Sequence, residues 1–434
     1  MEVRSITIGG FKNIEKTKVE IKKITALVSL NNYGKTNFLM GVDFGLDYLK
    51  RGEFERKRMM GLPRYIPLNP ILDNDPFFFE IELHEPKLKE YQFVRYGFSF
   101  KWKRDDDSGQ RLVDEWLDLR ESESTKYTGY LKRGEGKYRK SKTTNAFRNI
   151  NLSDYQLALD NLSSVDDLDY LEALRVIREF SFKTCSLLDM EKSYKQTLLE
   201  FDSEDLMTQA DNDIPKSLYH LEKNEPKQFE LFKESVLTLF DDISDFHVVK
   251  TDLNLDKYMI NTYSLSKQTG DSNESVPFKL KSEIYKIFVV SKYINQPIEI
   301  TMLSAGTKRL FWILATIFIS GSSSNLIAIE ELETSIHPNL LKKTLEIIYE
   351  YLGESKLIIT SHSPYLIQYL NLENIYVALP NSEGRATFRN ILKGKVRSVI
   401  NGARDNGLSV GEYLFELMGN NSKSIFNLKF LIEC

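Results

Sequence analysis

The stretch that most constrains the fold of this chain runs from Ile24 to Leu49. The apolar run "ITALVSL" is followed by the polar turn "NNYGKTN", and apolar residues then recur at spacings of three and four. The run is typical of a buried strand, and the recurring spacing is typical of a helix with one apolar face. A strand, a tight turn and a helix in this order form the context of a phosphate-binding loop. The sequence therefore predicts an α/β fold.

The turn matches the phosphate-loop pattern G-x-x-x-x-G-K-[ST] at every position but the first. Gly34 would let backbone amides close around phosphates, Lys35 would reach phosphate oxygens, and the Thr36 hydroxyl would hold magnesium. Ser29 stands where the first glycine is expected. That glycine mainly eases the turn out of the strand, so we expect the small serine to be tolerated.

Two carboxylates follow a second apolar run, "LIAI", in the stretch "LIAIEE". The run predicts a buried strand that delivers Glu330 and Glu331 to its carboxyl end, where open α/β sheets bind ligands. Such a pair can orient magnesium and polarise an attacking water. The alternative is an acidic turn that stabilises a helix N-terminus.

Two shorter motifs are further candidates for contacts with a phosphate. In "KLIITSHSP" a third apolar run ends just before His362, where an imidazole could contact a phosphate; the alternative is a structural histidine. In "MLSAGTKR" Ser304 and Gly306 open a predicted helix, whose N-terminus can bind an anion. The alternative there is a simple helix cap.

The order of these four motifs resembles that of the ATP-binding cassette (ABC) ATPases. The stretches "ITIGGFKNI", "NNYGKTN", "EELETSIHP" and "TSHSP" resemble more narrowly the SMC, RecF and overcoming-lysogenization-defect (OLD) branch. The resemblance covers about residues 1–100 and 280–380. It implies an ABC-type (SMC/RecF-like) P-loop ATPase head with an antiparallel β subdomain and a helical insertion.

The resemblance also implies ATP and Mg²⁺ as cofactors, with ATP held between two chains. Glu331 would be the general base, Glu330 and Thr36 would support the metal, and His362 would sense the γ-phosphate. One chain carries one copy of each motif, so a homodimer or higher oligomer is expected. The residues expected to contact the nucleotide are Ser29, Asn31, Asn32, Gly34, Lys35, Thr36 and Asn37, with Ser304 and Gly306 supplied by the other chain.

We expect four parts along the chain. Residues 1–110 would form the N-terminal part of the head, with the phosphate loop and the β subdomain, and residues 111–280 a mostly helical insertion. Residues 281–380 would complete the head. Residues 381–434 would be a C-terminal extension, with partner binding as one candidate role.

Composition and net charge limit the cellular location and the kinds of partner that we expect for this chain. No apolar stretch is long enough to span a membrane, and the first residues lack a secretory signal, so a cytoplasmic protein without a membrane partner is expected. The net charge of −4 excludes a strongly basic chain. Nucleic acid is a candidate partner only at Lys126–Lys142, where tyrosines alternate with basic residues, and a solvated loop is the alternative reading.

The stand-alone ATPases of bacterial antiphage systems match this organisation best, and in them an associated nuclease or toxin is the effector. Two alternatives stay open at this point. One is a nucleotide-gated scaffold with little turnover, because Ser29 and Glu330 depart from the usual residues. The other is a RecF/SMC-like DNA repair ATPase.

Overall fold

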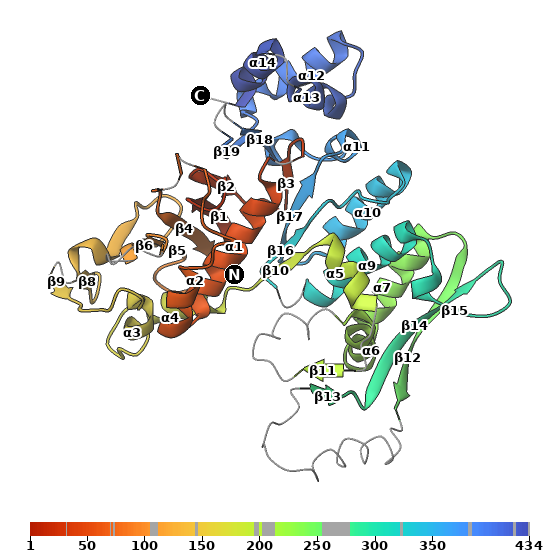
Figure 1. Ribbon diagram of the computed structural model, residues 1–434, viewed down its shortest axis with the longest axis horizontal. Coiled ribbons are helices and arrows are strands. Elements are labelled where there is room, and N and C mark those ends of the chain that lie inside the picture. Colours follow the sequence, from red (N-terminus) through yellow and green to blue (C-terminus); the bar gives the residue numbers. More distant parts are fainter. Residues whose placement is uncertain are drawn as a thin grey trace. The chain divides into compact units, whose positions relative to one another are not determined.

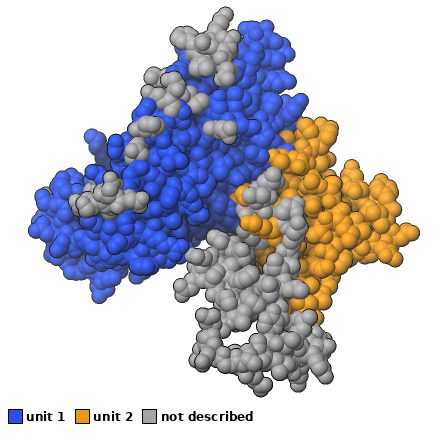
Figure 2. All heavy atoms as spheres, in the orientation of Figure 1, with its two compact units in different colours: residues 1–184, 323–333, 352–434 blue, residues 185–322, 334–351 orange. Residues whose placement is uncertain are grey.

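The computed structural model divides the chain into two compact units (Figure 2). Unit 1 comprises Met1–Thr184, Ser323–Glu333 and Leu352–Cys434, and unit 2 comprises Cys185–Ser322 and Thr334–Tyr351. The chain therefore passes from unit 1 into unit 2 and back twice. The structure describes residues 1–31, 33–69, 71–72, 74–104, 112–143, 146–194, 199–201, 213–253, 278–321, 324–380, 384–419 and 422–432.

An eight-stranded sheet of antiparallel neighbours forms one layer of unit 1 (Figure 1). Alternation explains its one buried face: in the strand "FFFEIELH" each second residue, beginning with Phe77, is buried. The strands lie in the order β2 (Thr17–Glu20), β1 (Glu2–Gly9), β4 (Phe77–His84), β5 (Phe93–Phe100), β6 (Leu112–Arg120), β7 (Thr128–Lys132), β8 (Lys137–Arg139) and β9 (Phe147–Asn149).

A six-stranded sheet forms the second layer of unit 1, and its central strands are parallel. These strands are almost wholly apolar and buried, as expected for strands covered on both faces. The order is β10 (Phe182–Cys185), β16 (Leu326–Ile329), β17 (Lys356–Ser361), β3 (Ile24–Val28), β18 (Ile375–Pro380) and β19 (Ala386–Asn390).

Helix α1 (Lys35–Lys50) packs closely on the antiparallel sheet through two glycines. A Cβ atom on Gly41 would lie 2.8 Å from Cγ2 of Ile8, and one on Gly45 would lie 2.1 Å from Cδ2 of Phe79. On another side, the ring of Phe38 lies 5.3 Å from that of Phe388 on β19. The helix that begins in the phosphate loop is thus fixed to both sheets.

Gly45→Ala is expected to destabilise the protein, although alanine is the better helix former by about 1 kcal/mol. Overpacking the contact with Phe79 typically costs about 1–3 kcal/mol. We expect a lower free energy of unfolding in urea titration. Gly394→Ala is the control, because a Cβ atom there would meet nothing within 4 Å. Equal stability of the two variants would contradict the close packing of α1.

Unit 2 is a helical layer beside a three-stranded antiparallel sheet. Helix α9 (Ala305–Ser320) is apolar on nearly all sides and contacts four other helices of this unit. Aromatic packing holds this layer together, with the ring of Phe232 within 5.6 Å of the rings of Phe246, Phe311 and Phe318. The main elements are α6 (Ile214–Asn224), α7 (Pro226–Leu239), β12 (Ile243–Asp252), β14 (Glu283–Ser291), β15 (Ile298–Glu299), α9 (Ala305–Ser320) and α10 (Pro338–Tyr351).

The predicted α/β fold with an antiparallel β subdomain is confirmed. The helical part begins later than the expected residue 111, because β6 to β9 continue the antiparallel sheet as far as Asn149. Because β7 and β8 contain basic residues and β7 contains a glycine, the sequence pattern did not predict these short strands. Helices α3 (Ala158–Leu162) and α4 (Leu171–Glu179) follow within unit 1, before unit 2 begins.

One of the C-terminal helices, α13 (Val410–Leu417), packs on the short helix that follows His362, which is α11 (Pro364–Ile367). A Cβ atom on Gly411 would lie 2.0 Å from the carbonyl oxygen of Pro364, so this contact requires glycine. The helices of this extension are α12 (Val396–Asp405), α13 (Val410–Leu417) and α14 (Ser422–Ile432). Among the helices of the described ranges, none combines the length and the apolar character that crossing a bilayer requires.

Candidate functional site

Three parallel strands bring the sequence motifs to one edge of the sheet (Figure 1). Strand β17 pairs with β16 on one side, with Ile359 opposite Ile329, and with β3 on the other, with Ser361 opposite Val28. The residues that directly follow the three strands are Glu330, His362 and Ser29. This is the edge at which open parallel sheets place their ligands.

Lys35 lies inside the phosphate loop rather than in solvent. Its ammonium group donates to the carbonyl oxygen of Ser29 (2.8 Å), the hydroxyl of Ser29 (3.0 Å) and the carbonyl oxygen of Leu30 (3.1 Å). Burial lowers the pKa of Lys35, while the charges of Glu331 and Glu333 act in the opposite direction. The serine at the first loop position therefore has a defined contact, because its buried hydroxyl accepts a hydrogen bond from the Lys35 ammonium group.

Gly34 is the glycine that the loop requires. Its φ of +89° is a left-handed conformation, and a Cβ atom there would lie 2.9 Å from Cδ1 of Ile14 and 3.0 Å from Cβ of Ala386. The residue precedes the first turn of α1, and its carbonyl oxygen accepts a hydrogen bond from Phe38. Gly34 thus allows the backbone turn after which α1 begins, with the N-terminus of the helix next to the loop.

The remaining predicted loop residues differ in position. Thr36 and Asn31 are exposed, the first in the opening turn of α1 and the second in the turn after β3. Asn37 instead donates to the side-chain oxygen of Asn13 at 2.8 Å, which ties α1 to the loop after β1. This contact gives Asn37 a structural role. Asn32 lies outside the described residues.

The loop after β16 presents Glu331 in an unusual backbone conformation. Glu331 has a φ of +47°, which is rare for a residue other than glycine, and its backbone N–H donates to Oγ1 of Thr360 on β17 at 3.0 Å. The side chain is 41% exposed, and its Oε1 lies 3.8 Å from Nδ1 of His362. Strain of this kind collects at functional sites. The neighbouring Glu330 is half-buried at the end of β16.

Glu333 is a site residue that the sequence motifs do not reveal. Its side chain is only 7% exposed, and its Oε1 accepts hydrogen bonds from the Ser361 hydroxyl (2.8 Å) and the His362 backbone N–H (2.9 Å). The same oxygen lies 3.7 Å from Nδ1 of His362. The available signal is its place two residues after Glu331 in "EELE". The structure thus brings Lys35, Glu331, His362 and this unpredicted carboxylate together.

Ser304 and Gly306 belong to unit 2, whereas the residues above belong to unit 1. The Ser304 side chain caps α9 by accepting from the backbone N–H of Thr307 at 3.2 Å, and it is exposed. A Cβ atom on Gly306 would lie 2.4 Å from the carbonyl oxygen of Ser335, so the glycine also has a packing role. The exposed N-terminus of this 16-residue helix is suited to an anion.

The donors in unit 1 fit a magnesium ion that is shared with a nucleotide. Among the described residues, no three histidine, cysteine or acidic side chains form a metal cluster. Mg²⁺ is usually held by one or two protein oxygens together with water and substrate phosphates. The Thr36 hydroxyl and the carboxylate of Glu330 are oxygen donors of that kind, and Oε2 of Glu333 is buried without a hydrogen-bond partner.

Two of the three tyrosines in the basic segment Lys126–Lys142 have hydrogen-bond partners in or next to the antiparallel sheet. The hydroxyl of Tyr127 donates to Glu82 at 2.8 Å, and Tyr130 is fully buried with its hydroxyl 2.8 Å from that of Tyr91. Four of its lysines form ion pairs, namely Lys132 and Lys137 with Glu135, Lys140 with Asp167, and Lys142 with Glu121. The segment is a charge-paired part of the antiparallel sheet, which agrees with neither of its sequence interpretations in full.

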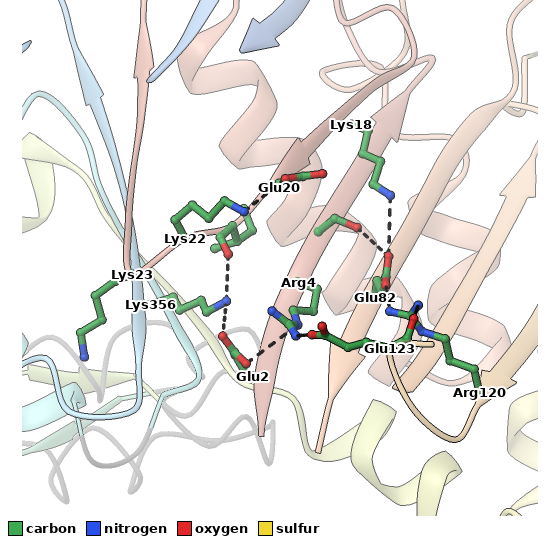
Figure 3. Close-up of a pocket in the computed structure, with 12 residues that line it drawn as sticks. Glu2, Arg4, Lys18, Glu20, Lys22, Lys23, Glu82, Arg120, Glu123 and Lys356 are labelled. Atoms are coloured by element: carbon green, nitrogen blue, oxygen red, sulfur yellow. Dashed lines mark hydrogen bonds and ion pairs between the residues drawn. The ribbon is translucent and has the colours of Figure 1, made fainter. Parts of the chain in front are cut away.

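A charged cavity of about 300 Å³ lies at the start of β17, at the strand end opposite His362 (Figure 3). Lys356 is buried there and donates to the carbonyl oxygens of Val3 (2.6 Å) and Ile21 (2.8 Å) and to Glu2 (2.7 Å). A second group of charges is centred on Glu82, which pairs with Lys18 and Arg120. Basic side chains outnumber acidic ones in the lining of this cavity, and Lys356 joins the two sheets through its bond to Val3 on β1.

This cavity predicts acid-sensitive stability. Burial tends to raise the pKa of Glu82, but the hydrogen bond from Tyr127 and the charges of Lys18 and Arg120 outweigh it, so the pKa lies below its ordinary value of 4.5. Stability from this carboxylate is therefore fully present above pH 4.5 and is lost as the pH falls through the lower folded-state pKa. We expect the melting temperature of Glu82→Gln to fall less steeply on acidification than that of the native protein. Parallel curves would contradict this account.

Residues 24–368 match a protein family described as "AAA domain, putative AbiEii toxin, Type IV TA system". No curated protein matches the chain. The match covers the phosphate loop, the start of α9 and both strands that carry the acidic and histidine motifs.

Solved structures of SMC heads are similar in backbone. A Smc head bound to the C-winged helix domain of ScpA has 13% identity and a TM-score of 0.49, covering 92% of this chain and 100% of that chain. The SMC head domain from Thermotoga maritima has 10% identity and a TM-score of 0.42, with coverage of 90% and 100%. A Smc head domain with an extended coiled coil, bound to the C-terminal domain of ScpA derived from Pyrococcus furiosus, has 12% identity and a TM-score of 0.46, with coverage of 93% and 99%.

Proposed function

Because the chain belongs to the family described as "AAA domain, putative AbiEii toxin, Type IV TA system", we propose that it is a Mg²⁺-dependent ATPase whose nucleotide is held between two copies of the chain. The observation that carries the proposal is the meeting of the phosphate loop, the acidic loop and His362 at the carboxyl edge of β3, β16 and β17. Sheets of this kind bind phosphates where a strand leads through a glycine-containing loop to a helix N-terminus.

Each residue has a role that follows from its position. Lys35 binds phosphate oxygens, aided by the N-terminus of α1. Glu331 is exposed enough to take a proton from an attacking water, and His362 beside it contacts the terminal phosphate. Thr36 and Glu330 hold the metal, which when bound neutralises charge on the phosphates.

The second copy supplies the N-terminus of α9. Ser304 is exposed at that terminus, and each chain has a single such segment in the motif order of the ABC-type ATPases. Because each chain offers both halves, a two-fold dimer would contain two identical sites, which fits the symmetry of most homodimers. ATP is therefore expected to join the chains, and hydrolysis to release them.

The biological role that we propose is the control of an effector, a nuclease or toxin, in prokaryotic antiphage defence. The family description names a putative toxin of a toxin–antitoxin system, which supports a role of this class. Helix α13 packs on α11, directly after His362, and α12 and α14 pack on α13, so these helices are suited to pass the nucleotide state to a partner. A repair ATPase is the other candidate, and salt-dependent binding to DNA ends would favour it.

Phosphate release by the purified protein tests the central activity. We expect release to require both ATP and Mg²⁺ and to accompany a doubling of mass in light scattering. Ser29→Gly is informative because it removes one acceptor of the Lys35 ammonium group. Faster release in this variant would indicate that the serine slows turnover. ATP-dependent dimers without phosphate release in either protein would favour a nucleotide-gated scaffold.

A further inference from the structure

Glu333 is a buried carboxylate in the loop after β16, and the four sequence motifs give it no role. One oxygen, Oε1, accepts from both the Ser361 hydroxyl and the His362 backbone N–H. The other, Oε2, is buried without a hydrogen-bond partner. Burying an ionisable group is unfavourable unless its interactions compensate, so a carboxylate kept at this position needs an explanation.

The contacts of Glu333 converge on His362. The same oxygen that accepts from the His362 backbone lies 3.7 Å from Nδ1 of the imidazole, and Oε1 of Glu331 lies 3.8 Å from that nitrogen. The imidazole nitrogen is therefore close to both the proposed general base and Glu333. Because Ser361 ends β17 and His362 directly follows it, the two bonds to Glu333 fix the backbone that carries the imidazole.

The surroundings of Glu333 connect it to the phosphate loop. Its charge, with that of Glu331, counteracts the effect of burial on the pKa of the Lys35 ammonium group. Glu333 thus acts electrostatically on Lys35 and also bonds the segment that carries His362. Its position near three groups of the site suggests a role in the reaction as well as in folding.

We propose that Glu333 is a positioning residue that holds the imidazole of His362 beside Glu331, through the His362 backbone N–H and the Ser361 hydroxyl. The inference rests on the proposed ATPase function. Glu333 touches neither the nucleotide nor the attacking water in this account, and it acts through His362. Its effect should therefore disappear when His362 is absent.

A double-mutant cycle tests this dependence with Glu333→Ala, His362→Asn and the double variant. We expect Glu333→Ala to lower kcat about tenfold or more while KM changes less than about threefold. In the His362→Asn background the same change should cost less than about twofold. Glu333→Gln keeps an oxygen that can accept both hydrogen bonds, so it should recover most of kcat. Glu354→Ala, at an exposed residue just before β17, is the matched control.

Additive losses in the double variant would overturn the proposal. So would a Glu333→Gln variant as impaired as Glu333→Ala. Should Glu333→Ala fail to fold, Ser361→Ala removes one of the two donors and is the milder variant. It should lower kcat in the same direction and by a smaller factor.

A second readout does not depend on turnover. The chain has 5 histidines, so their imidazole signals in an NMR spectrum can be assigned by single substitutions. We expect Glu333→Ala and Ser361→Ala to move the His362 signal, and Glu354→Ala to leave every signal in place. An unmoved His362 signal overturns the proposal. A native protein that binds and hydrolyses no ATP would refute the ATPase assignment alone, because this spectral test would still apply.

Discussion

Glu331→Gln is expected to lower the rate of ATP hydrolysis by about a hundredfold to ten thousandfold, the usual contribution of a general base. Glutamine preserves the shape of the side chain and cannot accept the proton of the attacking water. The backbone N–H bond to Thr360 is unaffected by the change, so the loop should keep its left-handed turn. The measurement is single-turnover phosphate release.

The same variant should bind ATP as tightly as the native protein and should remain dimeric for longer. Glu330→Gln is the matched control, since it alters the adjacent carboxylate; we expect it to raise the Mg²⁺ concentration needed for activity. Unchanged phosphate release in Glu331→Gln would remove Glu331 from the role of base. Loss of release from Glu330→Gln alone would transfer that role to its neighbour.

Lys35→Met should weaken ATP binding by about tenfold to a hundredfold, the equivalent of one lost hydrogen bond to a charged group. The ammonium group is buried in the loop and bonds three oxygens of Ser29 and Leu30. Methionine has a similar length and no donor, so these oxygens also lose their partner. We therefore expect a lower melting temperature in the absence of ATP, together with weak binding in titration calorimetry.

Lys50→Met is the matched control for Lys35→Met, because it replaces another lysine of α1 by methionine. Lys50 is the last residue of α1, at the helix end opposite the loop, and its loss should leave ATP affinity unchanged. Native-like affinity in Lys35→Met would contradict the phosphate-loop assignment. Loss of stability without loss of affinity would make Lys35 a structural lysine only.

The parts of the site that sequence predicted are those encoded by local patterns. Lys35, Glu331 and His362 each follow an apolar run, and a buried strand places the residue after it at the sheet edge. The fold class follows from the same runs. The resemblance implied that the three residues meet at one nucleotide, and the structure places them in the segments that follow neighbouring parallel strands.

The parts that sequence did not predict depend on contacts between distant residues. Glu333 bonds residues 28 and 29 positions further along the chain, and no spacing rule encodes such a pair. The bond between Asn37 and Asn13 was likewise not predicted, because it joins α1 to the loop after β1. The short strands β7 to β9 were missed because they have five residues or fewer and do not show a repeated apolar alternation.

Complementation between two inactive chains tests most directly whether the nucleotide site is shared between two copies. Lys35→Met removes the phosphate-binding lysine, and Ser304→Arg places a bulky side chain at the exposed N-terminus of α9. Neither variant should hydrolyse ATP alone. A mixed dimer contains one site with both halves intact, so an equal mixture should regain about a quarter of native activity, because half the dimers are mixed and each has one working site of two. A mixture as inactive as its components, or full activity of Ser304→Arg alone, would contradict the shared site.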